Sequence, residues 1–123
     1  MSEEIILEFE SDLFGIKDNS EGPLKIPKEY YTLTTERLKV RKQGVMTKTL
    51  SDIEVFKIND ITVKQKLTDK VRGVGDIEIL SADESDPKLI LKKVKDPHEV
   101  REQIRDAAKK AKEKMGVKYR YEL

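Results

Sequence analysis

The residues that could carry catalytic or metal chemistry are few in this chain. Cysteine is absent and histidine occurs once, at position 98. This excludes thiol catalysis, cysteine-based zinc sites and a Cys–His nucleophile. His98 lies at the start of a predicted helix, where a lone histidine is typical of a solvated surface. No carboxylate stands in an apolar stretch that would tune its pKa for acid–base catalysis. We therefore predict no catalytic residue and no enzyme activity.

Two short patterns resemble ligand-binding loops. Gly73 and Gly75 form the only Gly-x-Gly of the chain. Phosphate-binding glycine loops follow a strand and open a helix, whereas these glycines and Asp76 precede an alternating run that predicts a strand. They are therefore interpreted as a turn that needs a positive φ or a close backbone approach. The acidic run at residues 83–86 lacks the ligand spacing of a calcium loop, and we predict no metal, cofactor or small-molecule substrate.

The composition restricts the partners of the protein. The 123 residues correspond to one domain. Charged residues make up 40% of the chain, but 25 basic and 24 acidic side chains leave a net charge of +1. A nucleic-acid partner is not expected, because such proteins usually carry a basic excess that neutralises phosphates. No apolar run reaches the roughly 20 residues of a membrane span, and no signal peptide is recognisable. We expect a soluble, cytoplasmic protein.

The residue pattern over most of the chain is typical of short antiparallel strands. Runs rich in β-branched and aromatic residues, several of them alternating, predict strands at residues 30–34, 37–43, 45–51, 53–58, 60–66, 77–80 and 89–94. Brief polar connections separate the first five, at residues 35–36, 43–44, 51–52 and 59–60. Connections this short require antiparallel neighbours, because a parallel crossover needs a dozen or more residues.

Near residue 96 the spacing of the apolar residues changes from that of a strand to that of a helix. Asp96 as N-cap, Pro97 at the first helical position and Glu99 at the capping-box position together predict a helix start. A single apolar stripe then predicts a helix to about residue 115, formed by Val100, Ile104, Ala107, Ala108, Ala111 and Met115. Gly116 is interpreted as the residue that ends this helix.

The two termini predict strand-like arms. Alternation at Ile5–Phe9 predicts a strand within an N-terminal arm of residues 1–27. This arm could pack on its own domain, add a strand to a neighbouring subunit or be disordered. Alternation also predicts a strand-like tail at residues 117–123. That tail could lie along an edge of its own sheet, pair with the N-terminal segment or pair with another protomer.

These elements and motifs resemble the bacterial PH-like (pleckstrin-homology-like) domain family. The matching features are the Tyr-x-Leu-Thr run at residues 31–34 leading into Arg37-Leu38, the hairpin at Gly44, the run from Ile58 to Val63, the turn at residues 72–77 and the helix start at Asp96-Pro97. The resemblance covers roughly Tyr30 to Lys114. It implies a mainly β fold with one C-terminal α-helix: a PH-like barrel or orthogonal two-sheet sandwich of about seven antiparallel strands, capped by the helix. The domain would span residues 28–116, and the resemblance carries no catalytic site.

Two functions fit these observations. The first is a non-enzymatic binding or assembly module acting through protein–protein contacts or homo-oligomerisation, because exposed sheet edges and strand-like termini can pair across protomers. The second is peripheral binding of an anionic phospholipid membrane or a phosphate-bearing ligand by a basic strand face, formed by Arg37, Lys39, Arg41, Lys48, Lys64 and Lys66. The sequence does not fix the strand register, so whether these six side chains converge stays open at this point.

Overall fold

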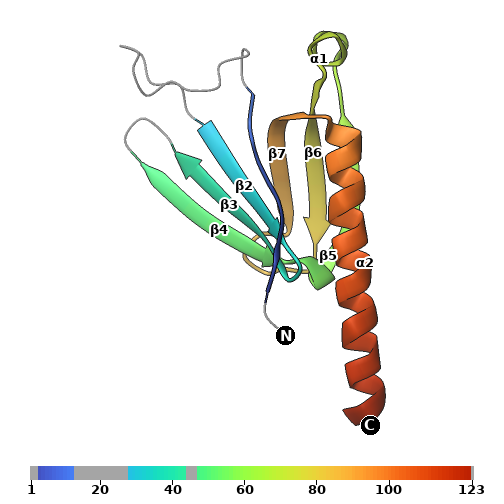
Figure 1. The fold of residues 1–123 in the computed structure, drawn as a ribbon. Coiled ribbons are helices and arrows are strands. Elements are labelled where there is room, and N and C mark those ends of the chain that lie inside the picture. Colours follow the sequence, from blue (N-terminus) through green and yellow to red (C-terminus); the bar gives the residue numbers. More distant parts are fainter. Residues whose placement is uncertain (1–2, 13–27, 44–46, 123) are drawn as a thin grey trace.

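The chain folds into two antiparallel sheets and a long helix (Figure 1). The computed structural model describes residues 3–12, 28–43 and 47–122. The first sheet contains β1 (Ile5–Glu10), β2 (Lys28–Thr34), β3 (Arg37–Gln43) and β4 (Lys48–Glu54), in that order. The second contains β5 (Ile58–Lys64), β6 (Val74–Ser81) and β7 (Lys88–Lys95). A 3₁₀ turn, η2 (Val55–Lys57), joins the sheets, α1 (Leu67–Arg72) lies between β5 and β6, and α2 (Pro97–Glu122) follows β7.

Contacts at two corners turn the two sheets into one PH-like unit. At one corner the chain passes directly from β4 through η2 into β5. At the other, an isolated antiparallel bridge pairs Ser11 with Val94, and Asp12 N donates to Lys93 O at 2.8 Å. The predicted fold of about seven antiparallel strands followed by a C-terminal helix is confirmed.

The core lies between the inner faces of the two sheets and one face of α2. Strand alternation places Leu38 and Val40 inward while Arg37, Lys39 and Arg41 stay exposed. The predicted helical stripe is buried at Val100, Ile104, Ala107 and Ala108. The two alanines let α2 approach β5 and β6 closely. In Figure 1, α2 continues well past the ends of the strands toward the C-terminus.

The two glycines of the Gly-x-Gly each perform one of the two predicted roles. Gly73 has a φ of +73° and caps α1, with its N donating to Lys70 O at 3.2 Å. Gly75 is a close approach, because a Cβ there would lie 2.7 Å from Gln65 Cγ and 3.0 Å from Pro97 Cγ. The short helix α1 before them was missed, since its six residues read as a polar turn.

The predicted division of the strands around residues 45–60 is wrong. Ser51 and Asp52 lie inside β4 rather than in a connection, and β4 ends at Glu54, where η2 begins. Asn59 and Asp60 likewise lie inside β5, at a register shift against β6. Polar side chains do not interrupt these strands, because the backbone makes the ladder. Asp52, Asn59 and Asp60 are exposed, and Ser51 is half-buried opposite Val40. The predicted hairpin at Gly44 lies outside the described residues.

The termini differ in how well their structure was predicted. β1 pairs with β2 of its own chain, as expected for an arm packed on its own domain, and residues 13–27 lie outside the described ranges. The strand-like tail is wrong over residues 117–122, because α2 continues through Gly116 to Glu122. A mid-helix glycine costs only about 1 kcal/mol, and each further helical residue gains a backbone hydrogen bond. Gly116 therefore does not end the helix.

The start of α2 is at Pro97, as predicted. Asp96 has a φ of 48° rather than the extended backbone of most N-caps, and its carbonyl accepts a hydrogen bond from Val100 N at 3.1 Å. Glu99 lies in the first turn, where a carboxylate complements the helix dipole.

Candidate functional site

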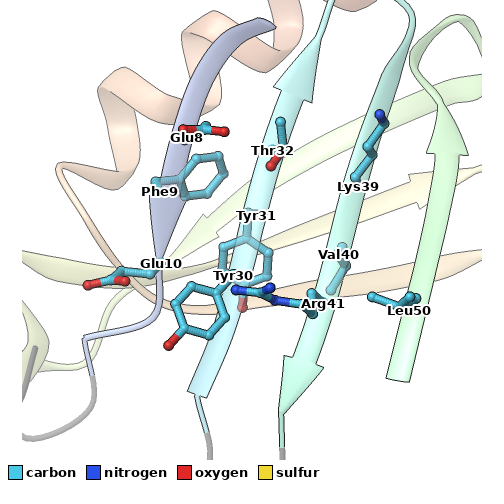
Figure 2. Close-up of a pocket in the computed structure, with 10 residues that line it drawn as sticks. All are labelled: Glu8, Phe9, Glu10, Tyr30, Tyr31, Thr32, Lys39, Val40, Arg41 and Leu50. Atoms are coloured by element: carbon cyan, nitrogen blue, oxygen red, sulfur yellow. The ribbon is translucent and has the colours of Figure 1, made fainter. Parts of the chain in front are cut away.

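The outer face of the first sheet carries an open hollow of about 660 Å³ (Figure 2). Strand register aligns Glu10, Tyr30, Arg41 and Leu50 in one row across all four strands. A second row contains Glu8, Thr32, Lys39 and Asp52. We call these two rows the outer rows. Each of them has an acid on β1 and a base on β3.

The first outer row combines a cation, an aromatic ring and an apolar side chain. The guanidinium of Arg41 lies 4.4 Å from the centre of the Tyr30 ring, and Figure 2 shows it extending over that ring. Such a cation–π contact holds the flexible arginine in place. Leu50, next to Arg41 on β4, is 68% exposed. A large apolar side chain this exposed is a candidate contact for a partner.

The structure brings together only part of the predicted basic face. Arg37, Lys39, Arg41 and Lys48 share the outer face of the first sheet. Two of these basic residues have an acid opposite them on β4: the register places Asp52 opposite Lys39 and Glu54 opposite Arg37. This face is therefore mixed in sign rather than uniformly positive.

The other two predicted basic residues lie away from the first sheet, Lys64 in β5 and Lys66 in the connection to α1. Lys64 on β5 is paired, with its Nζ 2.7 Å from Glu78 Oε2. The hydrogen bond from Lys64 lowers the pKa of Glu78. Lys66 directly precedes α1 and is exposed. The sequence could not separate these two lysines from the other four, because register and sheet membership depend on pairing between distant segments.

An ion pair between the buried Asp69 and the half-buried Lys93 anchors α1 against β7. Lys93 Nζ donates to both carboxylate oxygens of Asp69, at 2.9 and 3.1 Å. Asp69 also accepts from Lys66 N at 3.1 Å, and these bonds lower its pKa. Asp76, the third residue of the predicted turn, lies with Gly75 inside β6 instead, where its carboxylate accepts from Lys93 N at 3.0 Å. Lys93 has a φ of 48°, and both its backbone and its side-chain nitrogen donate to this cluster.

Three of the four sheet edges are partly covered. On β5, Arg101 Nε donates to Ile61 O at 2.9 Å and Lys112 Nζ donates to Ile58 O. Edges β1 and β7 meet at the Ser11–Val94 bridge, and the hydroxyl of Tyr31 accepts from Lys92 N on β7 at 3.0 Å. Side chains and neighbouring strands thus use edge groups that would otherwise accept a foreign strand.

The remaining edge, the outer edge of β4, is open. Within the ranges that the structure describes, its only strand partner is β3. Among the described residues, no side chain or neighbouring segment forms a hydrogen bond to this edge between Lys48 and Asp52. Figure 1 shows β4 at the margin of the first sheet, with no labelled element beyond it. The amino-acid sequence alone does not identify this edge, because β3 and β4 alternate in similar ways.

Two further observations concern the described part of the chain. Residues 3–12, 28–43 and 47–122 contain no group of three or more His, Asp or Glu side chains placed to hold a metal ion. Neither helix in these ranges combines the length and apolar character of a membrane span.

Comparison with known protein families identifies one family whose profile matches most of the chain. The profile of the bacterial PH domain family matches residues 25–108, which run from just before β2 into α2. The chain belongs to the bacterial PH domain family. Bacterial PH domains are a family of binding modules that are generally non-catalytic. Within this PH domain, β1 and the distal part of α2 lie outside the matched region. Searches among curated proteins and among solved structures found no match.

Proposed function

We propose that this bacterial PH domain is a non-enzymatic assembly module that self-associates through the open edge of β4. The observation that carries the proposal is the contrast between this edge and the three partly covered ones. A chain that protects β5 with Arg101 and Lys112 leaves the backbone of β4 free to pair. Addition of a strand to such an edge is a common mode of protein association.

The residues of β4 suit a second copy of the same strand in antiparallel orientation. With pairing centred on Leu50, Lys48 of one copy lies opposite Asp52 of the other, and the same pair recurs at the other end. Thr49 then faces Ser51, and the exposed Leu50 side chains cover each other. Opposite charges, hydroxyl pairs and apolar pairs facing each other across strands each contribute roughly 0.2–1 kcal/mol.

Other alignments of the two strands are less favourable. Parallel alignment in register brings Lys48 beside Lys48 and Asp52 beside Asp52, which is repulsive. Shifting the antiparallel centre to Ser51 keeps each side chain on its face but places Leu50 opposite Asp52. The Leu50-centred alignment therefore combines the complementary pairs. It involves few residues, so we expect a weak dimer whose population depends on protein concentration.

The mixed charge of the outer rows supports a self-complementary partner over an anionic surface. Lys39 and Arg37 face acids on β4, and Glu8 and Glu10 lie on β1 of the same face. A flat anionic membrane would meet both signs at once and gain little. A second copy added at the β4 edge meets only the charges of β4, and the antiparallel alignment pairs Lys48 with Asp52.

The test uses charge reversal at the two ends of the pairing. In a homodimer, Lys48→Asp places a carboxylate opposite Asp52 at both ends, and Asp52→Lys places two ammonium groups opposite each other at both ends. Each variant alone is expected to associate about tenfold more weakly than the parent, from the pair energies above. An equimolar mixture restores attraction between opposite charges in a heterodimer, so light scattering should recover dimer mass. The control Lys109→Asp makes the same charge change on α2 and should leave association unchanged.

A second measurement reports the centre of the pairing. The chain has no cysteine, so Leu50→Cys introduces a single thiol that faces its own copy in the dimer. Oxidation should cross-link Leu50→Cys much faster than Leu80→Cys, which is also exposed but lies on β6. A parent chain that stays monomeric at all accessible concentrations refutes self-association. A dimer whose two reversal variants fail to rescue each other refutes the Leu50-centred alignment.

A further inference from the structure

The most exposed apolar side chains among the described residues lie together on α1. Val71 is 82% exposed and Leu67 is 79% exposed. They are four residues apart in a helix, so they share one face. Figure 1 shows α1 at the far end of the second sheet, beyond β6, where it projects from the body of the domain. Exposure of two neighbouring aliphatic side chains at a projecting tip is costly in water and indicates a contact.

The exposed charged side chains of α1 beside Leu67 and Val71 are cationic. Lys66 and Lys70 are exposed and form no ion pair with the described residues. Arg72 is paired with Asp12: its Nη2 donates to Asp12 O at 2.7 Å and lies 3.8 Å from Asp12 Oδ1, while its side chain remains 35% exposed. The only acid of α1 is Asp69, which is turned inward, 5% exposed and paired with Lys93. Burial of Asp69 thus leaves α1 without an outward acid, so that its exposed side chains are aliphatic, cationic or, at Thr68, a neutral hydroxyl.

We infer that α1 is a membrane-contact tip that inserts Leu67 and Val71 into the headgroup region of an anionic bilayer. Lys66, Lys70 and Arg72 would lie at the level of the lipid phosphates. Surface-bound helices combine an apolar face with flanking Lys and Arg in this way, and each cation near an anionic surface strengthens binding. This contact is separate from the β4 edge and does not depend on self-association.

The size and shape of the tip favour a lipid surface over a protein partner. A stable protein interface buries roughly 800 Å² on each partner, whereas α1 offers two aliphatic side chains on a helix of six residues. A bilayer needs no complementary pocket and accepts a convex tip. The local excess of exposed cations also matches the negative surface of anionic lipids.

The experiment uses the absence of tryptophan from the chain. Val71→Trp provides a single fluorophore at the tip, and Leu80→Trp provides one at an exposed apolar position on β6. Both are mixed with vesicles of phosphatidylcholine alone or with phosphatidylserine added. We expect a blue shift for Val71→Trp with phosphatidylserine vesicles at low salt, lost as salt shortens the screening length. Leu80→Trp should show no shift.

Co-sedimentation with the same vesicles separates the apolar and the charged contributions. The double variant Leu67→Ser, Val71→Ser keeps every charge and should bind vesicles about tenfold more weakly. Lys66→Glu with Lys70→Glu should abolish the preference for phosphatidylserine, and Leu80→Ser serves as the matched control. Thermal unfolding should change little in all of them, because the altered side chains are exposed.

Three results would overturn the inference. The first is absence of vesicle binding at low salt, and the second is binding that the serine double variant retains in full. The third is an effect of that double variant on the mass of the protein in solution, measured by light scattering without vesicles. This last result would instead assign α1 to contact between copies of the chain.

Discussion

Replacing Gly75 by alanine would force a methyl group into space that is already filled. The new Cβ would lie 2.7 Å from Gln65 Cγ, 3.0 Å from Pro97 Cγ and 3.3 Å from Lys64 O. Carbon atoms in favourable contact are about 3.5–4.0 Å apart. Gln65 is not free to move aside, because its Nε2 donates to Val74 O at 2.8 Å and its Oε1 lies 3.1 Å from His98 Nε2. Overpacking of this kind costs about 1–3 kcal/mol.

Urea unfolding of a double-mutant cycle tests the cause of that cost. The variant Gln65→Ala deletes Cγ and thereby removes the shortest contact, while Pro97 remains. In the Gln65→Ala background, Gly75→Ala should therefore cost less by about 1 kcal/mol. The denaturant dependence of the unfolding free energy should stay unchanged, since the surface exposed on unfolding is the same.

Gly73→Ala is the matched control for this cycle. A Cβ at Gly73 meets nothing within 4 Å, but the φ of +73° is strained for alanine. Its cost, about 1–2 kcal/mol, should be the same with or without Gln65. If Gly75→Ala costs under about 0.5 kcal/mol, or costs the same in both backgrounds, close approach is not the reason for a glycine at position 75.

Three further predictions concern the core and its buried polar groups. Ile104→Ala should lower the free energy of unfolding by about 2–5 kcal/mol, because Ile104 is fully buried between α2 and the sheets; a loss under about 1 kcal/mol in urea unfolding would contradict this packing. The hydrogen bond from Lys93 lowers the pKa of Asp69. The ionised Asp69 therefore contributes to folding stability above pH about 4, and this contribution is lost as pH falls through the lowered pKa. The urea concentration at the unfolding midpoint should therefore decrease less at acid pH in Asp69→Asn than in the parent. An unchanged decrease would assign the acid sensitivity to other carboxylates. Burial and the hydrogen bond to Glu29 raise the pKa of Tyr31, so its stabilising effect is full below pH about 10 and falls as pH rises further. Tyr31→Phe should remove this loss of stability at alkaline pH in urea unfolding. A loss that persists in the variant would have its origin in another group.

The parts of the fold that the sequence predicted are those governed by local patterns. The stripe from Val100 to Ala108 indicated the buried face of α2, and Pro97 marked its first residue. The strand predicted at the Gly-x-Gly is present as β6, which begins at Val74. These features depend on neighbours within a few residues. Wrong predictions arose where competing local signals were of similar strength, as at Gly116, where helix continuation prevailed.

The candidate sites were harder to predict because they depend on contacts between distant segments. Alternation placed Lys39 and Lys64 equally on exposed strand faces, yet they belong to different sheets. α1 became a basic and apolar tip only because Asp69 turns inward to Lys93, 24 residues away. Read along the chain, Asp69 lies among Lys66, Lys70 and Arg72 and cancels part of their charge. Only the folded arrangement removes it from the surface.

The same reasoning explains why the open edge could not be predicted. Arg101 covers Ile61 on β5 from a position 40 residues away, and Ser11 reaches Val94 from the other end of the chain. No such donor reaches the outer edge of β4 within the described residues. Lys48 and Asp52 on that edge discourage indiscriminate pairing, as charges on edge strands generally do. Because they are spaced symmetrically about Leu50, the same two charges become attractive when the incoming strand is an antiparallel copy. An edge that repels most strands and accepts its own copy is what a specific assembly module requires.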